Sequence, residues 1–552
     1  MELSSDLRSI QETRSLLLRA KEAQKIYKEF SQVDVDRIVS KMAERGYEAR
    51  EKLAKLAVEE TGFGRVEHKV LKNIVGTKRL HDYIKDMKTC GIIRKTHNEK
   101  IWEVATPMGV VAALIPTTNP TSTMMYKAII ALKSRNAIVA SPHPRSIRCT
   151  LEAAQIMSQA AKEAGAPDGL VNCISLPTQE GTSELIRHEI TSVILATGGS
   201  AMVRAAYSSG KPAYGVGPGN VPAFIERTAN VAKAVADILF GKTFDNGTLC
   251  SSEQSIVCDL PIKSKVIAEL KKRGAYFVSN EERERLERYM FPKGLNPEVV
   301  GKPATFIAER AGIAVPSETT VLIAEIGGVG KKHPLSSEKL SPVLSFFTED
   351  GWEAGCKRSI EILEFGGIGH SLAVHTENPM VIEQFALHKP AHRILINTVS
   401  AVGAVGYTTD LPPAMTLGPG TIGGSITTDN ITPMHLLNIK RVAFETHPVN
   451  DTNGNFIPQD GESSSKKNES EPIVKRYDFA AKEGHSFMAE IEARIREKAG
   501  NKASPMMSGY KSSKPNGKQE SKDLSKAKND SMKSAVLSDA EINDLINQFK
   551  KK

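Results

Sequence analysis

Over residues 1–445, stretches with apolar residues at helical spacing alternate with short, almost wholly apolar runs that are rich in β-branched residues. The first hundred residues carry mainly the helical pattern. Strand-like runs follow at 110–115, 137–140 and 192–196, with a helical stretch at 153–162. Short buried strands that alternate with helices are typical of βαβ units around a mostly parallel sheet. The pattern therefore predicts an α/β fold.

From about residue 448 the chain is rich in Asn, Ser, Lys, Gly and Glu, a composition too polar to offset the entropy of ordering. We expect a disordered linker there, interrupted by two segments that contain regularly spaced apolar residues, 487–495 and 537–549. In the second segment Ser538 and Glu541 have capping-box spacing, and an apolar stripe follows at Ile542, Leu545, Ile546 and Phe549. A helix of about a dozen residues is marginal alone in water, so we expect it to dock on its own body or on another molecule.

The composition narrows the class of protein. The chain has 552 residues, 40% of them hydrophobic, which at roughly 100–200 residues per domain suggests about three units. It has no apolar run of about 18 residues, and its N-terminus lacks the layout of a signal peptide. The six cysteines form no CxxC pair, so we expect neither a metal site nor disulfides, and a cytoplasmic location.

Net charge does not indicate nucleic-acid binding. The total is +9, but residues 461–552 alone carry 19 Lys and Arg against 14 Asp and Glu, so the main body is close to balanced. No helix-turn-helix, zinc-finger or RNP-type motif accompanies the charge. We therefore expect no nucleic-acid partner, and we interpret the mixed charges of the tail as a solvated linker.

A candidate nucleophile lies in segment 244–255, where Cys250 follows a Gly-containing turn among small polar residues. Packing cysteines usually lie among Val, Ile and Leu, as Cys258 does, and the other four cysteines are interpreted in the same way.

Two further motifs follow predicted strands, at the strand ends where ligands of parallel sheets bind. Asn119, in the Pro-flanked loop after 110–115, carries an amide that can donate to an oxyanion, although Asn before Pro is often only turn chemistry. Segment 196–201 is a Gly-rich strand-to-helix turn that can bring N–H groups to a phosphate, but it is not a full G-x-G-x-x-G motif.

Together these motifs resemble the aldehyde dehydrogenase superfamily. Segments 141–145, 244–250, 366–371, 417–425 and 434–441 are similar to its CoA-acylating branch, and in particular to the acetaldehyde and propionaldehyde dehydrogenases of bacterial microcompartments. The resemblance implies a Rossmann-type cofactor domain at 1–225, an α/β catalytic domain at 226–425, and a returning segment at 426–445 that mediates dimers or tetramers. The linker would then span 446–536, and the terminal helix, at 537–552, would be an encapsulation peptide that binds a shell protein inside a microcompartment.

The resemblance also implies the roles of individual residues. Cys250 would be the nucleophile, and Asn119 with the Cys250 N–H would form the oxyanion hole. NAD, or NADP, would contact Ile115, Pro116, Thr117, Thr118, Ser141, Pro142, His143, Thr197, Gly198, Gly199, Ser200, Gly217 and Glu338, with Glu338 at the nicotinamide ribose. His370 is a possible auxiliary in proton transfer, but a loop histidine is as often structural.

Hydrolytic members of the superfamily carry a Glu that activates water, and we expect Gly215 to occupy that position here. Without a positioned carboxylate, a thioester on Cys250 is hydrolysed slowly and can react with a CoA thiol, which is a better nucleophile than water.

The resemblance thus predicts reversible, CoA-dependent oxidation of acetaldehyde or propionaldehyde with NAD reduction. The alternatives are another small aldehyde such as sulfoacetaldehyde or lactaldehyde, water or phosphate as acyl acceptor, and a non-catalytic microcompartment scaffold, against which Cys250 and Asn119 argue.

Overall fold

The structure is a computed structural model that describes residues 4–457. The segment at 487–495, the expected helix at 537–549 and most of the expected linker lie outside these residues. No helix within residues 4–457 has the length and apolarity needed to cross a membrane.

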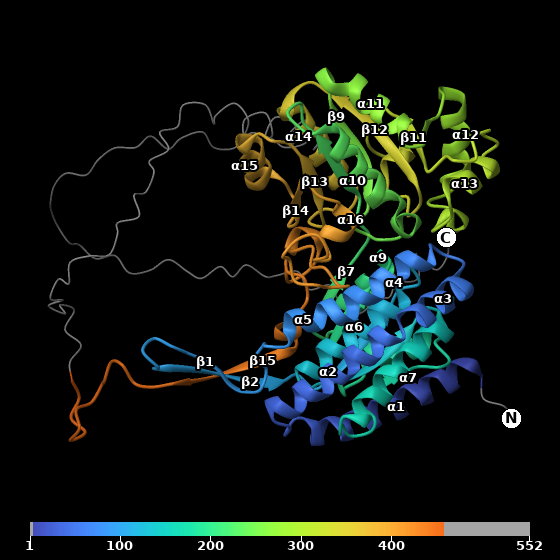
Figure 1. Cartoon of the computed structure of the whole chain (residues 1–552). Coiled ribbons are helices and arrows are strands. Elements are labelled where there is room, and N and C mark those ends of the chain that lie inside the picture. Colours follow the sequence, from blue (N-terminus) through green and yellow to red (C-terminus); the bar gives the residue numbers. More distant parts are fainter. Residues whose placement is uncertain (1–3, 458–552) are drawn as a thin grey trace, which may run out of the picture. The chain divides into compact units, whose positions relative to one another are not determined.

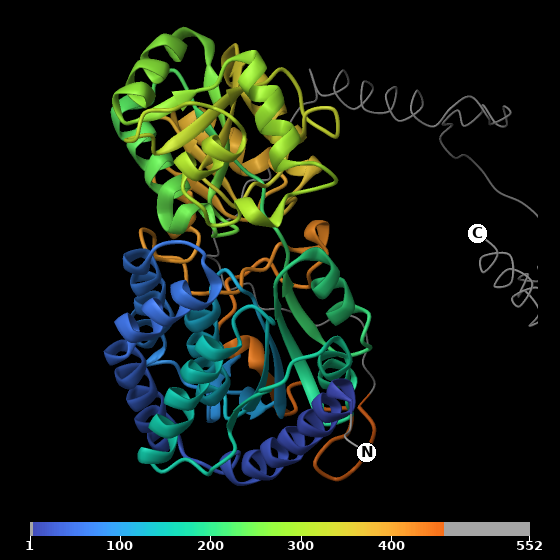
Figure 2. The same ribbon diagram turned by 90° about the vertical axis from the view of Figure 1, so that its right-hand side faces the viewer.

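The chain begins with helices, as the sequence pattern predicts: α1 (Ser5–Tyr27), α2 (Gln32–Glu48), α3 (Arg50–Thr61), α4 (Val66–Ile74) and α5 (Leu80–Ile84), with a π-helical turn η1 (Val75–Arg79) between the last two. Serine side chains start the first two helices, because Ser4 accepts from the N–H of Leu7 and Ser31 from that of Asp34. Figure 2 shows these helices, in blue, beside the sheet that follows.

The first sheet is parallel and has the strand order β5-β4-β3-β6-β7. Its strands are β3 (Val110–Ile115), β4 (Ala137–Pro142), β5 (Val171–Cys173), β6 (Thr191–Thr197) and β7 (Ala213–Val216), and its helices are α6 (Pro120–Lys133), α7 (Ile147–Glu163), α8 (Gln179–Arg187) and α9 (Ser200–Tyr207). All three strands expected from apolar runs are present. Strand β3 is wholly buried, which explains why its sequence is continuously apolar.

The second sheet is also parallel, in the order β10-β11-β12-β9-β8-β13-β14. Its strands are β8 (Val221–Ile225), β9 (Glu253–Asp259), β10 (Ala275–Phe277), β11 (Val321–Glu325), β12 (Val343–Glu349), β13 (Leu372–His375) and β14 (Ile394–Ile396), and its helices are α10 (Val231–Thr243), α11 (Lys263–Lys272), α12 (Asn280–Met290), α13 (Ala304–Arg310), α14 (Gly351–Phe365) and α15 (Pro379–His388). Alternate strand residues enter two separate cores: Val257 belongs to one, and Ile256 and Cys258 to the other. Cys258 is thus a packing residue, as expected.

A third, antiparallel sheet contains β1 (Gly91–Thr96), β2 (Ile101–Pro107) and β15 (Leu437–Ala443), which form the long ribbon in Figure 1.

The break between the two parallel sheets falls between Val216 and Val221, a few residues before the expected domain boundary at 225. After β14 and the short helix α16 (Ser400–Gly403), buried residues between 399 and 436 pack into the core of the first sheet. The later part of the expected catalytic segment therefore returns to the first core.

Candidate active site

A cavity of about 580 Å³ lies at the carboxyl ends of β3 and β6. Twelve of the residues selected from the sequence line it: Ile115, Pro116, Thr117, Thr118, Asn119, His143, Thr197, Gly198, Gly199, Gly217, Cys250 and Glu338. Four others do not: Ser141, Pro142, Ser200 and His370. The structure thus brings the predicted nucleophile, amide and cofactor loops around one space, while the role of each residue stays a prediction.

Cys250 is held at the cavity by a tight turn. The 3₁₀ turn η2 (Phe244–Gly247) ends three residues before it, and Asp245 and Asn246 adopt left-handed φ angles of 50° and 53°. This conformation is uncommon for residues other than glycine and needs support from its surroundings. Burial and the neighbouring Glu338 raise the pKa of the Cys250 thiol to about 12, whereas Arg393 and Lys72 act in the opposite direction. The thiol is therefore protonated at neutral pH in this state.

Asn119 is the residue that immediately precedes helix α6. Its Oδ1 accepts from Lys72 Nζ at 2.6 Å, and its Nδ2 donates to Thr118 Oγ1 at 3.1 Å. An ammonium group only donates, so Lys72 fixes which end of the amide carries the oxygen. Within residues 4–457 the Nδ2 group makes this one hydrogen bond, which leaves its second N–H available, and the residue lines the cavity.

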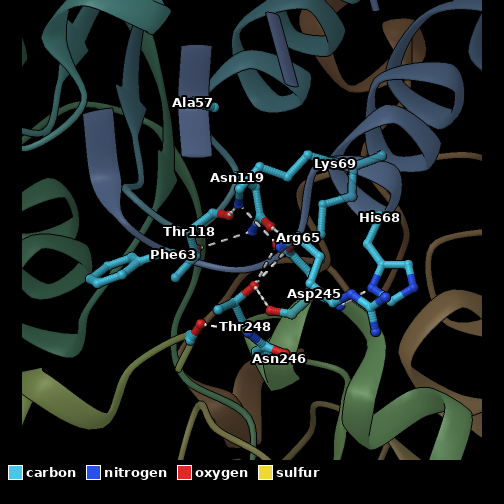
Figure 3. A network of polar contacts seen from close by, with 12 residues as sticks. Ala57, Phe63, Arg65, His68, Lys69, Thr118, Asn119, Asp245, Asn246 and Thr248 are labelled. Carbon is cyan, nitrogen blue, oxygen red and sulfur yellow. Dashed lines mark hydrogen bonds and ion pairs between the residues drawn. The ribbon is translucent and has the colours of Figure 1, made fainter. Parts of the chain in front are cut away.

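A buried ionic network joins helix α4 to the turn before Cys250 (Figure 3). Asp245 Oδ2 accepts from Lys69 Nζ at 2.9 Å and pairs closely with Lys72 Nζ. Its Oδ1 accepts from the N–H of Arg65 at 2.8 Å. Both lysine side chains are only 3% exposed and Asp245 is fully buried. The two ammonium groups hold the pKa of Asp245 down, at about 2, against the effect of burial.

The lining around Gly199 and Gly217 leaves open space for a dinucleotide. A β-carbon added at Gly199 or Gly217 would meet no atom within 4 Å, and α9 begins directly after Gly199 without a side-chain cap on its N–H groups. Glycines that leave room for a close backbone approach, together with free N–H groups, suit a pyrophosphate. Glu338 lines the same cavity and accepts from the N–H of Gly219 at 3.0 Å. These residues fit a nicotinamide dinucleotide.

Gly215, which we expect to occupy the position of the water-activating Glu, is not among the residues that line the cavity. It lies in β7, where an added β-carbon would come 2.8 Å from Val203 and 3.0 Å from Tyr207 on α9. The neighbours that do line the cavity are Val216, Gly217 and Pro218, none of which carries an ionisable side chain. Among the lining residues Glu338 is the one carboxylate. Across residues 4–457 no group of three or more His, Cys, Asp or Glu side chains is arranged to hold a metal ion.

His370 lies behind this lining, close to the nucleophile. An added β-carbon at Gly219 would be 2.0 Å from the carbonyl oxygen of Cys250 and 3.4 Å from the His370 ring. Arg393 donates to the His370 carbonyl at 3.0 Å, and His370 Nε2 has no hydrogen-bond partner. Burial and the Arg393 charge lower the pKa of His370 to about 3, so its imidazole is neutral at pH 7.

Lys72, Asp245 and Arg393 are site residues that our sequence analysis missed. The available signal was the pair of lysines at i and i+3 on one short helix, Lys69 and Lys72, together with an acidic residue five positions before the cysteine. Charged residues at such spacing usually lie on a solvated face, and their burial here depends on contacts more than 170 positions apart.

Comparison with known proteins defines the class. Residues 8–285 match the aldehyde dehydrogenase family, and the chain belongs to that family. An aldehyde-alcohol dehydrogenase of Clostridium acetobutylicum is 42% identical over 429 residues, which are 77% of this chain and 50% of that protein. The chain thus spans about half the length of the aldehyde-alcohol dehydrogenases that it matches.

Two solved structures are similar over most of the described chain. An acetylating aldehyde dehydrogenase from Geobacillus thermoglucosidasius is 51% identical with a TM-score of 0.80, covering 81% of this chain and 99% of that one. A propionaldehyde dehydrogenase from the fucose utilisation bacterial microcompartment of Clostridium phytofermentans is 30% identical with a TM-score of 0.70, covering 78% and 97%.

Proposed function

We propose that this chain catalyses the NAD-dependent oxidation of a short-chain aldehyde, acetaldehyde or propionaldehyde, to its acyl-CoA through a thioester on Cys250. The observation that carries the proposal is the shared cavity, which Cys250, Asn119 and the open glycines at 199 and 217 all line. The names of the similar proteins, which include acetylating and propionaldehyde dehydrogenases, support the same reaction class.

In the first half-reaction the Cys250 thiol loses its proton to solvent, its sulfur forms a bond to the aldehyde carbon, and the carbonyl oxygen becomes an oxyanion. The Asn119 Nδ2 group and the Cys250 N–H donate to that oxygen. NAD, when bound along the cofactor loops, supplies the hydride acceptor. Loss of hydride from the carbon and collapse of the oxyanion leave a thioester on Cys250.

In the second half-reaction the CoA sulfur attacks this thioester, and the bond to Cys250 breaks. Exchange of one thioester for another is nearly thermoneutral, and a thiolate is a stronger nucleophile than water. In this proposal the proton of the CoA thiol passes to the departing Cys250 sulfur, whose thiol has a pKa of about 12, and His370, which is neutral at pH 7, is an auxiliary in that transfer. A propionaldehyde dehydrogenase of Rhodopseudomonas palustris, 27% identical with a TM-score of 0.70, was determined with bound CoA and an acylated cysteine.

NADH formation by the purified chain tests the proposal, with acetaldehyde and propionaldehyde, with and without CoA, and with NADP in place of NAD. We expect turnover that requires CoA and is abolished in Cys250→Ala. Cys356→Ala is the matched control, because Cys356 is a partly buried packing cysteine on α14. Absence of turnover with any short aldehyde would overturn the proposal in favour of a scaffold role.

Hydrolysis is the second candidate, because the Glu338 carboxylate lines the cavity with Cys250. Steady NADH formation without CoA that disappears in Glu338→Gln would assign water as the acyl acceptor. We expect instead that Cys250 retains the acyl group until CoA arrives.

Assembly and location stay predictions. A homo-oligomer joined through the β1, β2 and β15 ribbon should exceed the mass of one chain in light scattering. Microcompartment packaging is supported by the amphipathic pattern at 537–549 and by the similar enzyme from a bacterial microcompartment. Residues 530–552 fused to a fluorescent protein should then collect in compartments, and diffuse fluorescence in compartment-forming cells would contradict the location.

A further inference from the structure

We infer that Lys72 is a positioning residue that holds the Asn119 amide in the orientation needed to stabilise an oxyanion and ties it to the Cys250 turn. The inference rests on the proposed function, in which Asn119 donates to that oxygen. Lys72 Nζ is 2.6 Å from Asn119 Oδ1. Because the ammonium cannot accept a hydrogen bond, the opposite amide orientation would place two donors face to face.

The same nitrogen contacts the segment that carries the nucleophile. Lys72 Nζ pairs with Asp245 Oδ2 and lies 3.1 Å from Thr248 Oγ1, two residues before Cys250. Thr248 in turn donates to Asp245 Oδ2 at 2.7 Å. One ammonium group therefore fixes the distance between the amide loop after β3 and the strained turn before Cys250. A catalytic donor needs this fixed placement, since a displacement of about 1 Å can cost a hundredfold in rate.

Charge also favours this role. Lys69 and Lys72 share one carboxylate, so the buried network carries an excess positive charge beside the site where the oxyanion forms. A preorganised positive charge in a water-poor site stabilises developing negative charge. Loss of Lys72 leaves Asp245 paired with Lys69, and we therefore expect the fold to survive the substitution.

The test uses acylation of Cys250 by p-nitrophenyl acetate, which needs no dinucleotide, CoA or knowledge of the natural aldehyde. The burst of p-nitrophenol should be about 100- to 1000-fold slower in Lys72→Met, as for loss of one oxyanion donor, with the KM for the ester changed less than about threefold. Lys69→Met is the matched control: Lys69 contacts Asp245 and the Thr118 carbonyl but not Asn119, and we expect less than about a tenfold loss.

A double-mutant cycle separates positioning from a general structural role. If Lys72 acts through Asn119, the Lys72→Met and Asn119→Ala pair should be no slower than Asn119→Ala alone. The inference would be overturned if the fold-losses in burst rate of Lys72→Met and Asn119→Ala multiplied in the double variant. It would also be overturned if Lys69→Met and Lys72→Met slowed the burst equally. Should Lys72→Met fail to fold in thermal denaturation, Lys72→Gln replaces it in the same cycle. The ester burst needs no NAD, so the two proposals can fail separately. If the chain does not oxidise aldehydes but the double-mutant cycle gives the expected result, the proposed function is refuted and the role of Lys72 stands.

Discussion

The carbonyl oxygen of Cys250 lies against the α-carbon of Gly219, where an added β-carbon would stand 2.0 Å from that oxygen. The neighbouring atom is backbone and cannot rotate away. Gly219→Ala should therefore displace the nucleophile, lowering the free energy of unfolding by about 1–3 kcal/mol and kcat by about a hundredfold. Denaturant titration and the NADH assay measure the two effects.

Gly217→Ala is the control for this prediction. It lies two residues away and lines the same cavity, but its β-carbon would meet no atom within 4 Å. We expect its free energy of unfolding to lie within about 0.5 kcal/mol of the wild-type value. Its KM for NAD should be raised, because the methyl group enters the space expected for the cofactor. Equal destabilisation of both variants would contradict the close contact at Gly219.

The Glu338 carboxylate should control the reactivity of Cys250 in a pH-dependent way. Burial raises the pKa of Glu338 to about 8, so the group is mostly neutral at pH 6.5 and mostly charged at pH 9. Its negative charge raises the pKa of the Cys250 thiol. Alkylation of Cys250 by iodoacetamide should thus be faster in Glu338→Gln at pH 9, by about tenfold for each unit by which the thiol pKa falls, and similar to wild type at pH 6.5.

Peptide mapping of the alkylated cysteine makes this measurement specific, and Cys356 in the same digest provides the internal control. A uniform acceleration at both pH values would indicate a wider access route to Cys250 and would contradict the electrostatic explanation.

The sequence was most informative where local pattern and chemistry agree. The apolar run at 110–115 is strand β3 residue for residue, because a strand buried on both faces needs continuous apolar side chains. We selected Cys250 because its polar neighbours are unlike those of a packing cysteine, and the structure places it in the lining of the cavity. Most of the loop residues predicted to bind the cofactor line the same cavity, because parallel strands end at one edge of a sheet.

What the sequence concealed depends on contacts between distant segments. Lys72 belongs to a short charged helix, and its burial depends on Asp245, 173 positions away. That Gly215 packs against α9 while Gly217 lines the cavity could not be predicted, because the stretch 214–220 contains several glycines and only the strand register distinguishes them. Arg393 likewise lacks a local signal, although its charge acts on both Cys250 and His370.

Asp245→Asn should show how strongly the fold depends on the buried network. The substitution keeps the shape of the side chain but leaves Lys69 and Lys72 without an opposite charge. Removing one partner of a buried ion pair costs about 3–5 kcal/mol, so we expect a loss of that size in denaturant titration at pH 7.

The exposed pair of Lys78 and Asp82 is the matched control, since both side chains are more than half exposed. Asp82→Asn should change stability by less than about 1 kcal/mol. The pKa of Asp245 is lowered to about 2, so the stability that its charge provides is present above about pH 4 and is lost as the pH falls toward 2. The difference between wild type and Asp245→Asn should accordingly shrink in that acidic range, and a constant difference would contradict an ionic origin.

His370→Gln should separate the two half-reactions. If the imidazole assists transfer of the CoA thiol proton to the departing Cys250 sulfur, the variant should release one NADH per active site in a rapid burst and then turn over about 100- to 10,000-fold more slowly. The pKa of about 3 keeps His370 neutral above about pH 5, so wild-type acyl transfer should show no break near pH 6.5 from this group. His375→Gln is the control. His375, at the end of β13, is as buried as His370, which lies just before that strand, but it has no proposed role in proton transfer. Stopped-flow absorbance at 340 nm measures both phases, and loss of the burst itself would place His370 in the oxidation step.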